Sequence, residues 1–396
     1  MKRKLNICIV HSNRNAFSET FIRNHIKFLS ANVYDLYGGW FPAFDKNDHR
    51  IADYFIERNV MSKLVVFGCK LLPAFVSNRL PSSVKGYPYD EALNKSAFRY
   101  FLKKKNIDVV LAEFMIKGIV VMDICTELKI PFVLHTHGGG DIMNKADLEN
   151  YLKFFPELFQ KVSRVISVDS YSSSSLLKLG LEKEKLFKIG LGIDLSLFSV
   201  AKPSKNDYIF FAVGRFVDKK APYLTIIAFA EVLQKHPEAK LIIAGNGILF
   251  ECCNQIVRSL KIEANVIFPG VLTPLEVAEY MSKSRAFVQH SVHTAAGDSE
   301  GIPVAILEAM ACGLPVISTY HNGIADTITH GFDGLLVEEN DIKTMSRYFI
   351  QLIEEPALAD ELGLKARKKI EKEFEMSKVI NDLEAVINDA YTNFNK

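Results

Sequence analysis

Two glutamates stand eight residues apart where a loop enters an apolar helix. Glu300 lies in the loop, and Glu308 lies within the predicted helix 304–311, whose other side chains are apolar. A buried carboxylate is costly unless it meets hydrogen-bond donors. Sugar hydroxyls would supply them, with one glutamate on a ribose and the other on a transferred hexose. A structural interpretation stays open, in which such a glutamate only complements the helix dipole.

The start of this helix is itself a candidate anion site. The run 286–289 predicts a buried parallel strand just before the loop. Pro303 suits a helix start, because its missing N–H would have no partner there, and Gly313 suits the stop. The backbone N–H groups of Gly301 and Ile302 would then point out of the helix start, where anions bind.

A second candidate site holds two cations. Arg215 and Lys220 follow Gly214 in a loop between a predicted strand, 208–213, and a predicted helix, 225–235. Arginine offers a planar fork of donors and lysine a point charge, and both suit phosphate oxygens. A plain surface cluster of charges is the alternative, but an anion site in the same half of the chain favours phosphate binding.

A third candidate site follows the predicted strand 131–134. His137 and Asp141 enclose three glycines there, and His137 is placed as a proton carrier or a hydrogen-bond partner of a sugar. A histidine beside glycines is often only structural. The sequence leaves open whether His135 or His137 faces the sugar.

Several familiar ligand motifs are absent from the sequence. Gly245 and Gly247 follow the predicted strand 241–244, but position 250 is Phe250, so the dinucleotide fingerprint is incomplete. There is no Walker loop, and no two aspartates stand two residues apart. Without a D-x-D clamp for a divalent metal, we expect a diphosphate to be neutralised by side chains and a helix start, and no metal or cofactor to be required.

Composition limits the class of protein. The chain has 396 residues, with 48% apolar and 24% charged residues and a net charge of +2. That length exceeds one hydrophobic core, so two domains are expected. The near-neutral charge argues against a dedicated nucleic-acid binder. The six cysteines include no C-x-x-C pair, which indicates buried thiols of a reducing compartment rather than disulfides or zinc ligands.

Strands alternate with helices on both sides of a polar break at 201–207, which we take as the domain linker. This alternation predicts an α/β protein with two doubly wound parallel sheets. Residues 38–90 show no clear pattern and are predicted to be irregular. Ligands of such sheets bind at the carboxyl ends of strands. The three candidate sites all lie there and should face a common cleft: 135–141, 214–220 and 297–308.

No segment is long and apolar enough to span a membrane, since the best, 64–76, is interrupted by Lys70 and Pro73. Lysines and arginines nonetheless border apolar residues over 61–85, as in interfacial helices. A core helix with solvated lysines is the more common meaning of that pattern. The apolar part of the N-terminus is too short for a signal peptide and is expected to be a first strand.

These residues together resemble a known family. Glu300 and Glu308, with the surrounding Gly301, Pro303 and 309–311, look like the E-x7-E signature of glycosyltransferase family 4, retaining enzymes of the GT-B fold. Gly214-Arg215 with Lys220 resembles the G-R-x4-K phosphate loop of that family. Two further matches are 18–22 and 192–194, and the likeness is strongest over 208–340. Within the family, the chain most resembles the branch that makes bacterial capsules, exopolysaccharides and lipopolysaccharide.

Two positions depart from the family pattern. The H-G-x-D motif has one extra glycine between His137 and Asp141, and Leu191 replaces a common asparagine before Gly192.

The resemblance implies three parts of the chain and a role for each candidate residue. Residues 1–200 would form an acceptor-binding domain, 201–375 a nucleotide-sugar-binding domain, and 376–396 a helix crossing back to the first. The implied catalytic residues are Arg215, Lys220, Glu300 and His137, with the first two on the leaving diphosphate. The implied donor-binding residues are Gly214, Gly245, Gly247, Gly301, Ile302, Pro303 and Glu308, and the acceptor-side residues are Ser18, Glu19 and Asp141.

The implied activity is retaining, metal-independent transfer of a hexose from a nucleoside-diphosphate sugar, with UDP favoured over GDP. The acceptor would be a glycan or a lipid-linked glycan used in cell-surface polysaccharide synthesis. The enzyme would be cytoplasmic, weakly held on the inner face of the membrane. Two alternatives remain open: a sugar-nucleotide epimerase of the same fold, and a non-catalytic protein that binds glycans or nucleotide sugars.

Overall fold

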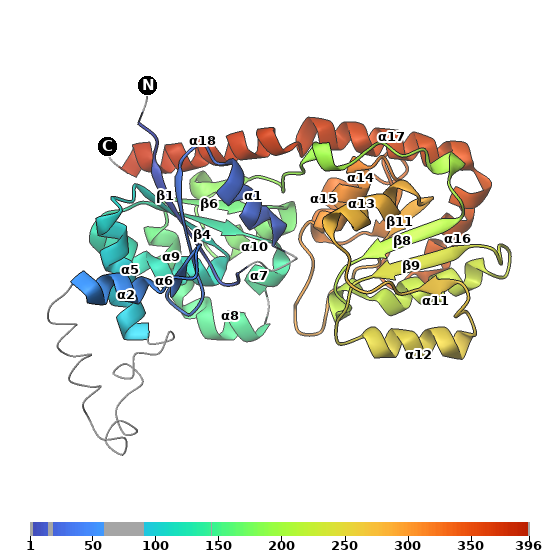
Figure 1. The fold of residues 1–396 in the computed structure, drawn as a ribbon, viewed down its shortest axis with the longest axis horizontal. Helices are drawn as coiled ribbons and strands as arrows, with labels where there is room; N and C mark the ends of the chain where they lie inside the picture. The colour runs from blue at the N-terminus through green and yellow to red at the C-terminus, as the bar shows by residue number, and fades with distance from the viewer. Residues whose placement is uncertain (1–2, 15–18, 59–90, 144, 395–396) are drawn as a thin grey trace, which may run out of the picture.

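The computed structural model describes residues 3–14, 19–58, 91–143 and 145–394. They form two α/β domains side by side, with a long pair of helices along one side of both (Figure 1). The predicted acceptor-side Ser18 and the predicted membrane segment 61–85 lie outside the described residues.

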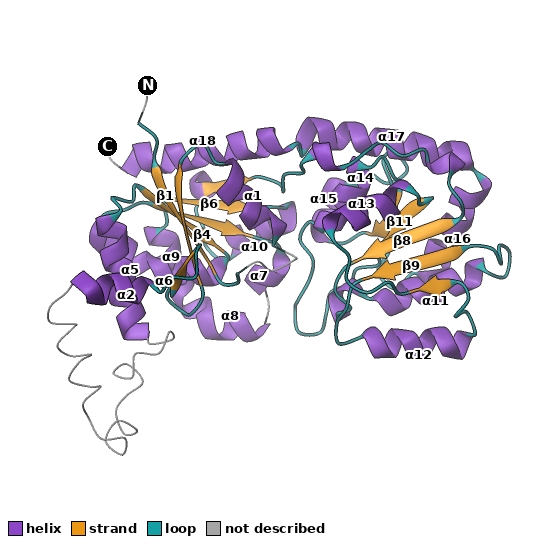
Figure 2. Ribbon diagram, viewed as in Figure 1, coloured by secondary structure: helices purple, strands orange, loops and turns teal. Residues whose placement is uncertain are grey.

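The first domain is built on a seven-stranded sheet (Figure 2). Its order is β3-β2-β1-β4-β5-β6-β7, and all pairs are parallel except β2 with β3. The predicted parallel sheet is confirmed apart from this short antiparallel edge pair. The prediction that 38–90 is irregular is wrong within its described residues, because β3 and a helix, α2, lie there. The strands are β1 (Asn6–His11), β2 (Asn32–Tyr37), β3 (Phe44–Asp45), β4 (Val109–Glu113), β5 (Phe132–Thr136), β6 (Arg164–Ser167) and β7 (Leu186–Lys188).

Helices cover both faces of this sheet, and local capping sets where several of them begin and end. Asp169 caps α10 by accepting a hydrogen bond from the Ser172 amide at 2.7 Å. α6 ends at Lys129, which adopts the left-handed conformation. The helices are α1 (Thr20–Phe28), α2 (Ile51–Arg58), α5 (Glu91–Lys104), α6 (Met115–Leu128), α7 (Gly139–Met143), α8 (Lys145–Tyr151), α9 (Phe155–Lys161) and α10 (Ser170–Lys178).

The second domain has a six-stranded, wholly parallel sheet in the order β10-β9-β8-β11-β12-β13. Its last strand, β13, was not predicted, because three apolar residues between polar turns give too short a signal. The strands are β8 (Ile209–Val213), β9 (Lys240–Ala244), β10 (Val266–Ile267), β11 (Ala286–Val288), β12 (Val316–Thr319) and β13 (Leu335–Val337).

The helices of the second domain follow the predicted pattern closely. Pro303 immediately precedes α14, and Gly313 ends it with a φ of +69°. Thr273 and Glu276 form a capping box at the start of α13. The helices are α11 (Pro222–Val232), α12 (Phe250–Leu260), α13 (Pro274–Ser282), α14 (Val304–Ala311), α15 (Asn322–Thr327), α16 (Ile342–Glu354) and α17 (Pro356–Glu373).

The last helix, α18 (Met376–Phe394), contacts β4, β5 and β6 of the first sheet. Its apolar side chains enter the core there, and Arg164 of β6 forms an ion pair with Asp389 at 2.6 Å. The chain thus leaves the first domain before β8 and returns to it at its end (Figure 1). Within the described parts of the chain, none of the helices has the length and hydropathy needed to cross a bilayer.

Four of the five cysteines that the structure describes are buried, as predicted, but Cys252 is exposed.

Candidate active site

An ion pair joins two of the predicted site residues. The Lys220 Nζ lies 3.0 Å from Glu300 Oε2, and their side chains are 16% and 10% exposed. Lys220 comes from the loop after β8 and Glu300 from the loop after β11, and these strands are neighbours in the sheet. The topology therefore brings a carboxylate and a cation together across 80 residues of sequence.

Two residues that the sequence analysis missed complete this pair. Lys219 lies 2.9 Å from Asp298 and 3.8 Å from Glu300 Oε1, so it is a second cation beside the carboxylate. The buried Gln289 accepts a hydrogen bond from Lys220 at 3.2 Å. Gln289 directly follows β11, and its polar side chain after an apolar run was the available signal.

The charges within the pair depend on each other. Burial raises the pKa of Glu300, but the positive charges of Lys220 and Lys219 outweigh this and hold it below its usual value. Burial lowers the pKa of Lys220, and the Glu300 carboxylate opposes that effect. Oε1 of Glu300 is buried and has no hydrogen-bond partner among the described residues. The site therefore presents a fixed carboxylate oxygen that can accept a hydrogen bond from a ligand.

Arg215 is exposed and forms no ion pair with any residue that the structure describes. It lines a small hollow together with Gly214, Lys220 and Gln289. A cation held near a second cation, without a carboxylate of its own, is suited to an incoming anion.

Gly245 and Gly247 pack against the backbone of the loop that contains Arg215. A Cβ on Gly245 would lie 2.0 Å from the Gly214 carbonyl oxygen, and one on Gly247 would lie 2.5 Å from that of Phe216. The Phe216 amide also donates to the Asn246 carbonyl at 2.9 Å. The structure thus gives both glycines a role in shaping the loop of Arg215.

Glu308 has a pKa raised above its usual value. It lies on α14 and is partly buried, and its carboxylate has no hydrogen-bond partner among the described residues. Burial alone raises the pKa of Glu308 to about 7. A ligand that donates hydroxyl hydrogen bonds to Glu308 would stabilise its carboxylate form.

The start of α14 leaves two amides available. The amides of Gly301 and Ile302 donate to no acceptor in the described chain, whereas the Glu300 amide donates to Nε2 of His321 at 3.0 Å. The other nitrogen of that ring, Nδ1, lies 2.6 Å from Glu339, which fixes the tautomer. His321 and Glu339 were not foreseen, since nothing local links them to the loop.

The first domain contributes a histidine cluster around one buried carboxylate. Glu113 ends β4, is fully buried, and lies 2.6 Å from His137 Nε2 and 2.8 Å from His25 Nδ1. The His137 ring stacks on Phe21 with centroids 4.0 Å apart. Burial dominates and lowers the pKa of His137 to about 3, so the ring is neutral. With Nε2–H donating to Glu113, its Nδ1 is an acceptor, and this atom is buried without a described partner.

His135 faces the interior. It is 1% exposed, neither ring nitrogen has a described hydrogen-bond partner, and burial lowers its pKa. Its Nδ1 lies 3.4 Å from Glu113.

Asp141 serves the backbone in this structure. Its carboxylate accepts hydrogen bonds from the amide of Met115 at 3.0 Å and that of His137 at 3.2 Å. These bonds explain why α6 begins at Met115, because an acidic side chain satisfies the first amides of a helix. Asp141 thereby fixes the loop that holds His137.

Glu19 lies beside a small cavity of about 80 Å³ at the end of β1, which Arg14 also lines. One carboxylate oxygen of Glu19 accepts from Asn13 at 2.8 Å, and the other is buried without a described partner.

Two glycine loops bring the domains together. A Cβ on Gly138 would lie 2.6 Å from the Cα of Gly301, and one on Gly140 would lie 2.4 Å from Asp298. The predicted strand-end sites at 135–141 and 297–308 are therefore in direct contact. His137 and the Glu300–Lys220 pair lie at one junction between the domains.

Comparison with known proteins identifies this arrangement. Residues 196–369 match the family "Glycosyl transferases group 1", and this range contains the whole Arg215, Lys220, Glu300 and Glu308 constellation. The chain carries a group 1 glycosyltransferase domain. It is a glycosyltransferase.

Curated relatives and solved structures extend the likeness. The glycosyltransferase is 29% identical over 293 residues to the Escherichia coli K12 protein named "Putative colanic acid biosynthesis glycosyltransferase WcaL". The match covers 71% of this chain and 70% of that protein. It is 29% identical over 238 residues to the amylovoran biosynthesis glycosyltransferase AmsK of Erwinia amylovora, covering 60% of this chain and 58% of AmsK.

Among solved structures, HepE of Anabaena in complex with UDP and glucose has a TM-score of 0.73 at 16% identity, over 98% of this chain and 100% of HepE. Sucrose-phosphate synthase of Thermosynechococcus elongatus has a TM-score of 0.73 at 17% identity, over 98% and 100%. At these identities the likeness shows the fold, which confirms the predicted GT-B architecture.

Among the described residues, two clusters have the residue types of a metal site. The ligand atoms of His25, Glu113 and His135 lie within 4.8 Å of one another, as do those of His293, His321 and Glu339. In the second cluster, both histidines lie at hydrogen-bond distance from Glu339, and His321 also accepts the Glu300 amide. That cluster is thus accounted for by its hydrogen bonds.

We expect Glu113→Gln to reduce turnover of the glycosyltransferase by about 10- to 100-fold, the usual range for a residue that orients another. A glutamine amide can donate to His137 Nε2, which would reverse the tautomer and turn Nδ1 into a donor. Steady-state kinetics of the variant test this, with nucleotide affinity as the control. Nucleotide affinity should not change, because His137 lies in the first domain. Wild-type turnover in the variant would contradict the role given to Glu113.

Proposed function

We propose that this glycosyltransferase moves a hexose from a UDP-sugar to a glycan or lipid-linked glycan acceptor, with retention of configuration and without a metal ion. The observation that carries the proposal is the set of groups at this site. It comprises the cations Arg215 and Lys220, two unpaired amides, the unpaired Oε1 of Glu300, and Glu308, whose carboxylate has no donor among the described residues. A diphosphate offers acceptors to the cations and amides. A ribose and a hexose offer hydroxyls to Glu308 and Glu300.

The proposed reaction proceeds on one face of the donor sugar. The bond between the anomeric carbon and the phosphate oxygen breaks, and an acceptor hydroxyl oxygen forms the new bond on the same face. The proton of that hydroxyl passes to the leaving phosphate oxygen. Arg215 and Lys220 stabilise the charge that develops on the diphosphate, in a site where the neighbouring domain excludes water.

Relatives support the class of product and of donor. WcaL and AmsK are named for colanic acid and amylovoran biosynthesis, and HepE is solved with UDP and glucose. We therefore place this enzyme in exopolysaccharide synthesis and favour UDP over GDP. A thermal-shift screen against the two nucleotides tests the base: at 100 times its dissociation constant, the bound nucleotide adds about 2.7 kcal/mol of stability. A shift with GDP and none with UDP would overturn the preference.

The transfer itself is tested by NMR of the product. A donor with an α-linked sugar should give an α-linked product if configuration is retained. A β-linked product would show inversion, and a new sugar nucleotide formed without acceptor would show an epimerase.

We expect nucleotide-sugar binding to release protons between about pH 5 and 7. Free Glu308 holds a proton up to about pH 7, above its usual range, because it is buried without donors. Ribose hydroxyls would favour its carboxylate form, so binding drives the proton off and weakens as the pH falls below 7. Calorimetry in two buffers of different ionisation enthalpy measures the release.

The ligand for this test is a UDP-sugar rather than UDP, since a terminal phosphate titrates near pH 6 by itself. Glu308→Gln is the matched control and should release no protons. Equal proton release by the wild type and the variant would remove Glu308 from the nucleotide site.

We expect transferase activity to survive EDTA, because the proposed counter-charges are Arg215, Lys220 and backbone amides. The measurement is the initial rate after exhaustive dialysis against the chelator. Loss of activity that added Mg²⁺ or Mn²⁺ restores would show that a metal neutralises the diphosphate instead.

Peripheral contact with the inner face of the cytoplasmic membrane is also proposed, from the basic and apolar residues of 61–85 alone. Salt-sensitive co-sedimentation with anionic vesicles, lost when Lys63, Lys70 and Lys85 are reversed in charge, tests it.

A further inference from the structure

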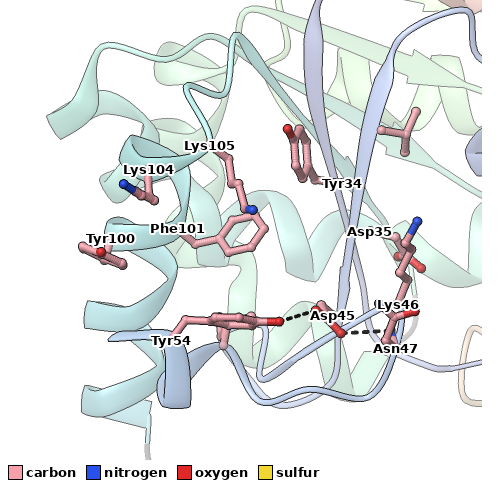
Figure 3. Close-up of a pocket in the computed structure, with 12 residues that line it drawn as sticks. Tyr34, Asp35, Asp45, Lys46, Asn47, Tyr54, Tyr100, Phe101, Lys104 and Lys105 are labelled. Carbon is pink, nitrogen blue, oxygen red and sulfur yellow. Dashed lines mark hydrogen bonds between the residues drawn. The ribbon is translucent and has the colours of Figure 1, made fainter. Parts of the chain in front are cut away.

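A cavity of about 370 Å³ lies at the outer edge of the first sheet, between β2, α2 and the end of α5 (Figure 3). Its volume falls within the range of small-ligand sites, roughly 300–1,000 Å³. None of the residues assigned above to donor binding or catalysis lines it. We call it the β2-edge cavity.

The sheet topology leaves this cavity open. β3 pairs only with Leu36 and Tyr37 at the end of β2. Residues 33–35 of β2 therefore have no neighbouring strand on that side among the described residues, and they line the cavity instead.

Aromatic rings form much of its wall. Tyr34 and Tyr54 lie on opposite sides, with Phe101 between them (Figure 3). Tyr34 meets Phe101 edge to face at 6.0 Å, and Tyr54 is 41% exposed. Exposed ring faces carry partial negative charge and attract the positive C–H edges of a ligand, which is how a sugar ring packs on tyrosine.

The charged side chains that line the cavity include more unpaired lysines than unpaired carboxylates. Asp35 pairs with a histidine of β1 at 2.7 Å, and Asp45 accepts two backbone amides at 2.9 and 3.1 Å. Lys46, Lys104 and Lys105 have no carboxylate partner within the described chain. Lys105 Nζ instead lies 5.8 and 5.9 Å from the centres of two aromatic rings of the cavity. The ligand that complements this wall is acidic.

The β2-edge cavity neighbours the small cavity at the end of β1. It shares Asp35 and Lys46 with the smaller cavity, which Glu19 lines. That smaller cavity is bordered by α1, whose Phe21 stacks on His137. Two shared residues and one helix thus connect the surroundings of the β2-edge cavity with His137.

We propose that the β2-edge cavity binds an acidic sugar residue of the acceptor saccharide, with its ring on Tyr54 and its carboxylate on Lys104 and Lys105. The assignment of this ligand as the acceptor rests on the proposed function. The binding of an acidic saccharide in the cavity is independent of that function.

Calorimetry on the full chain without donor tests the binding. The probe is a tetrasaccharide containing glucuronic acid, and its matched control is the same tetrasaccharide with each carboxylate reduced to a hydroxymethyl group. We expect the reduced form to bind about tenfold more weakly, as loss of charged hydrogen bonds implies. Equal binding of the two forms, or no binding of the acidic one, would overturn the proposal.

Three variants locate the site. Lys104→Ala/Lys105→Ala and Tyr54→Ala should each weaken binding of the acidic saccharide about tenfold or more. Lys103→Ala, exposed on the same helix but outside the cavity, should not. UDP binding should stay unchanged in all three. If the double variant binds the saccharide as the wild type does, the cavity is not the site, whether or not the enzyme transfers sugar.

Discussion

Lys220→Ala is expected to lower turnover by about 10²–10³-fold, the usual cost of removing one group that stabilises developing charge. It should also destabilise the fold, because Glu300 is buried and loses the cation 3.0 Å away. Breaking a buried pair costs about 3–5 kcal/mol. We expect the lower end, since Lys219 remains 3.8 Å from the same carboxylate. Steady-state kinetics and denaturant unfolding measure the two effects.

Arg215→Ala is the matched control for stability. Arg215 is exposed and unpaired among the described residues, so its loss should reduce turnover to a similar degree while leaving the free energy of unfolding unchanged. The two variants should differ in stability because only Lys220 forms a buried ion pair with Glu300. Near-normal turnover in either variant would show that this loop does not bind the leaving diphosphate.

Gly138→Ala should reduce turnover by about 10²-fold while leaving UDP affinity unchanged. The added Cβ would meet the backbone of Gly301 at 2.6 Å, and neither side of the contact is a flexible side chain. The loops of the two domains would have to separate, and a misplacement of about 1 Å can cost that much in rate. The nucleotide groups lie on the second domain and should be undisturbed.

Gly180→Ala controls for backbone strain. Gly180 has a φ of +101°, close to the +110° of Gly138, but a Cβ there would meet nothing within 4 Å. An alanine at either position is therefore strained by a similar positive φ. Only Gly138→Ala also disturbs the contact between the loops of the two domains. Equal kinetics in the two variants would mean that contact between the domain loops is not needed for transfer.

The fold was largely predictable because apolar runs of the right length alternate with amphipathic helices through most of the chain. The failures have physical reasons. β3 has only two residues and β13 only three, so neither gives a periodic signal. α7, α8 and α9, within 139–161, were also missed. These helices are only five to seven residues long.

The candidate site was predictable where chemistry and local structure coincide, as at Arg215, Lys220 and Glu300. The site was not predictable where a functional side chain finds its hydrogen-bond partner on a strand far away in the sequence. Glu113 ends a buried strand and had no visible role, yet it organises His137. Asp141 looked like a ligand-binding residue, but its carboxylate is engaged by backbone amides. Such roles depend on which strand ends meet, and periodicity does not report that.

The most direct test of the proposed transfer is the release of nucleoside diphosphate from a panel of sugar nucleotides, with and without a saccharide acceptor. We expect release of UDP that depends on acceptor and falls by about 10²-fold or more in Arg215→Ala. Release that is independent of acceptor, conversion of the donor to an epimer, or full activity of the variant would contradict it.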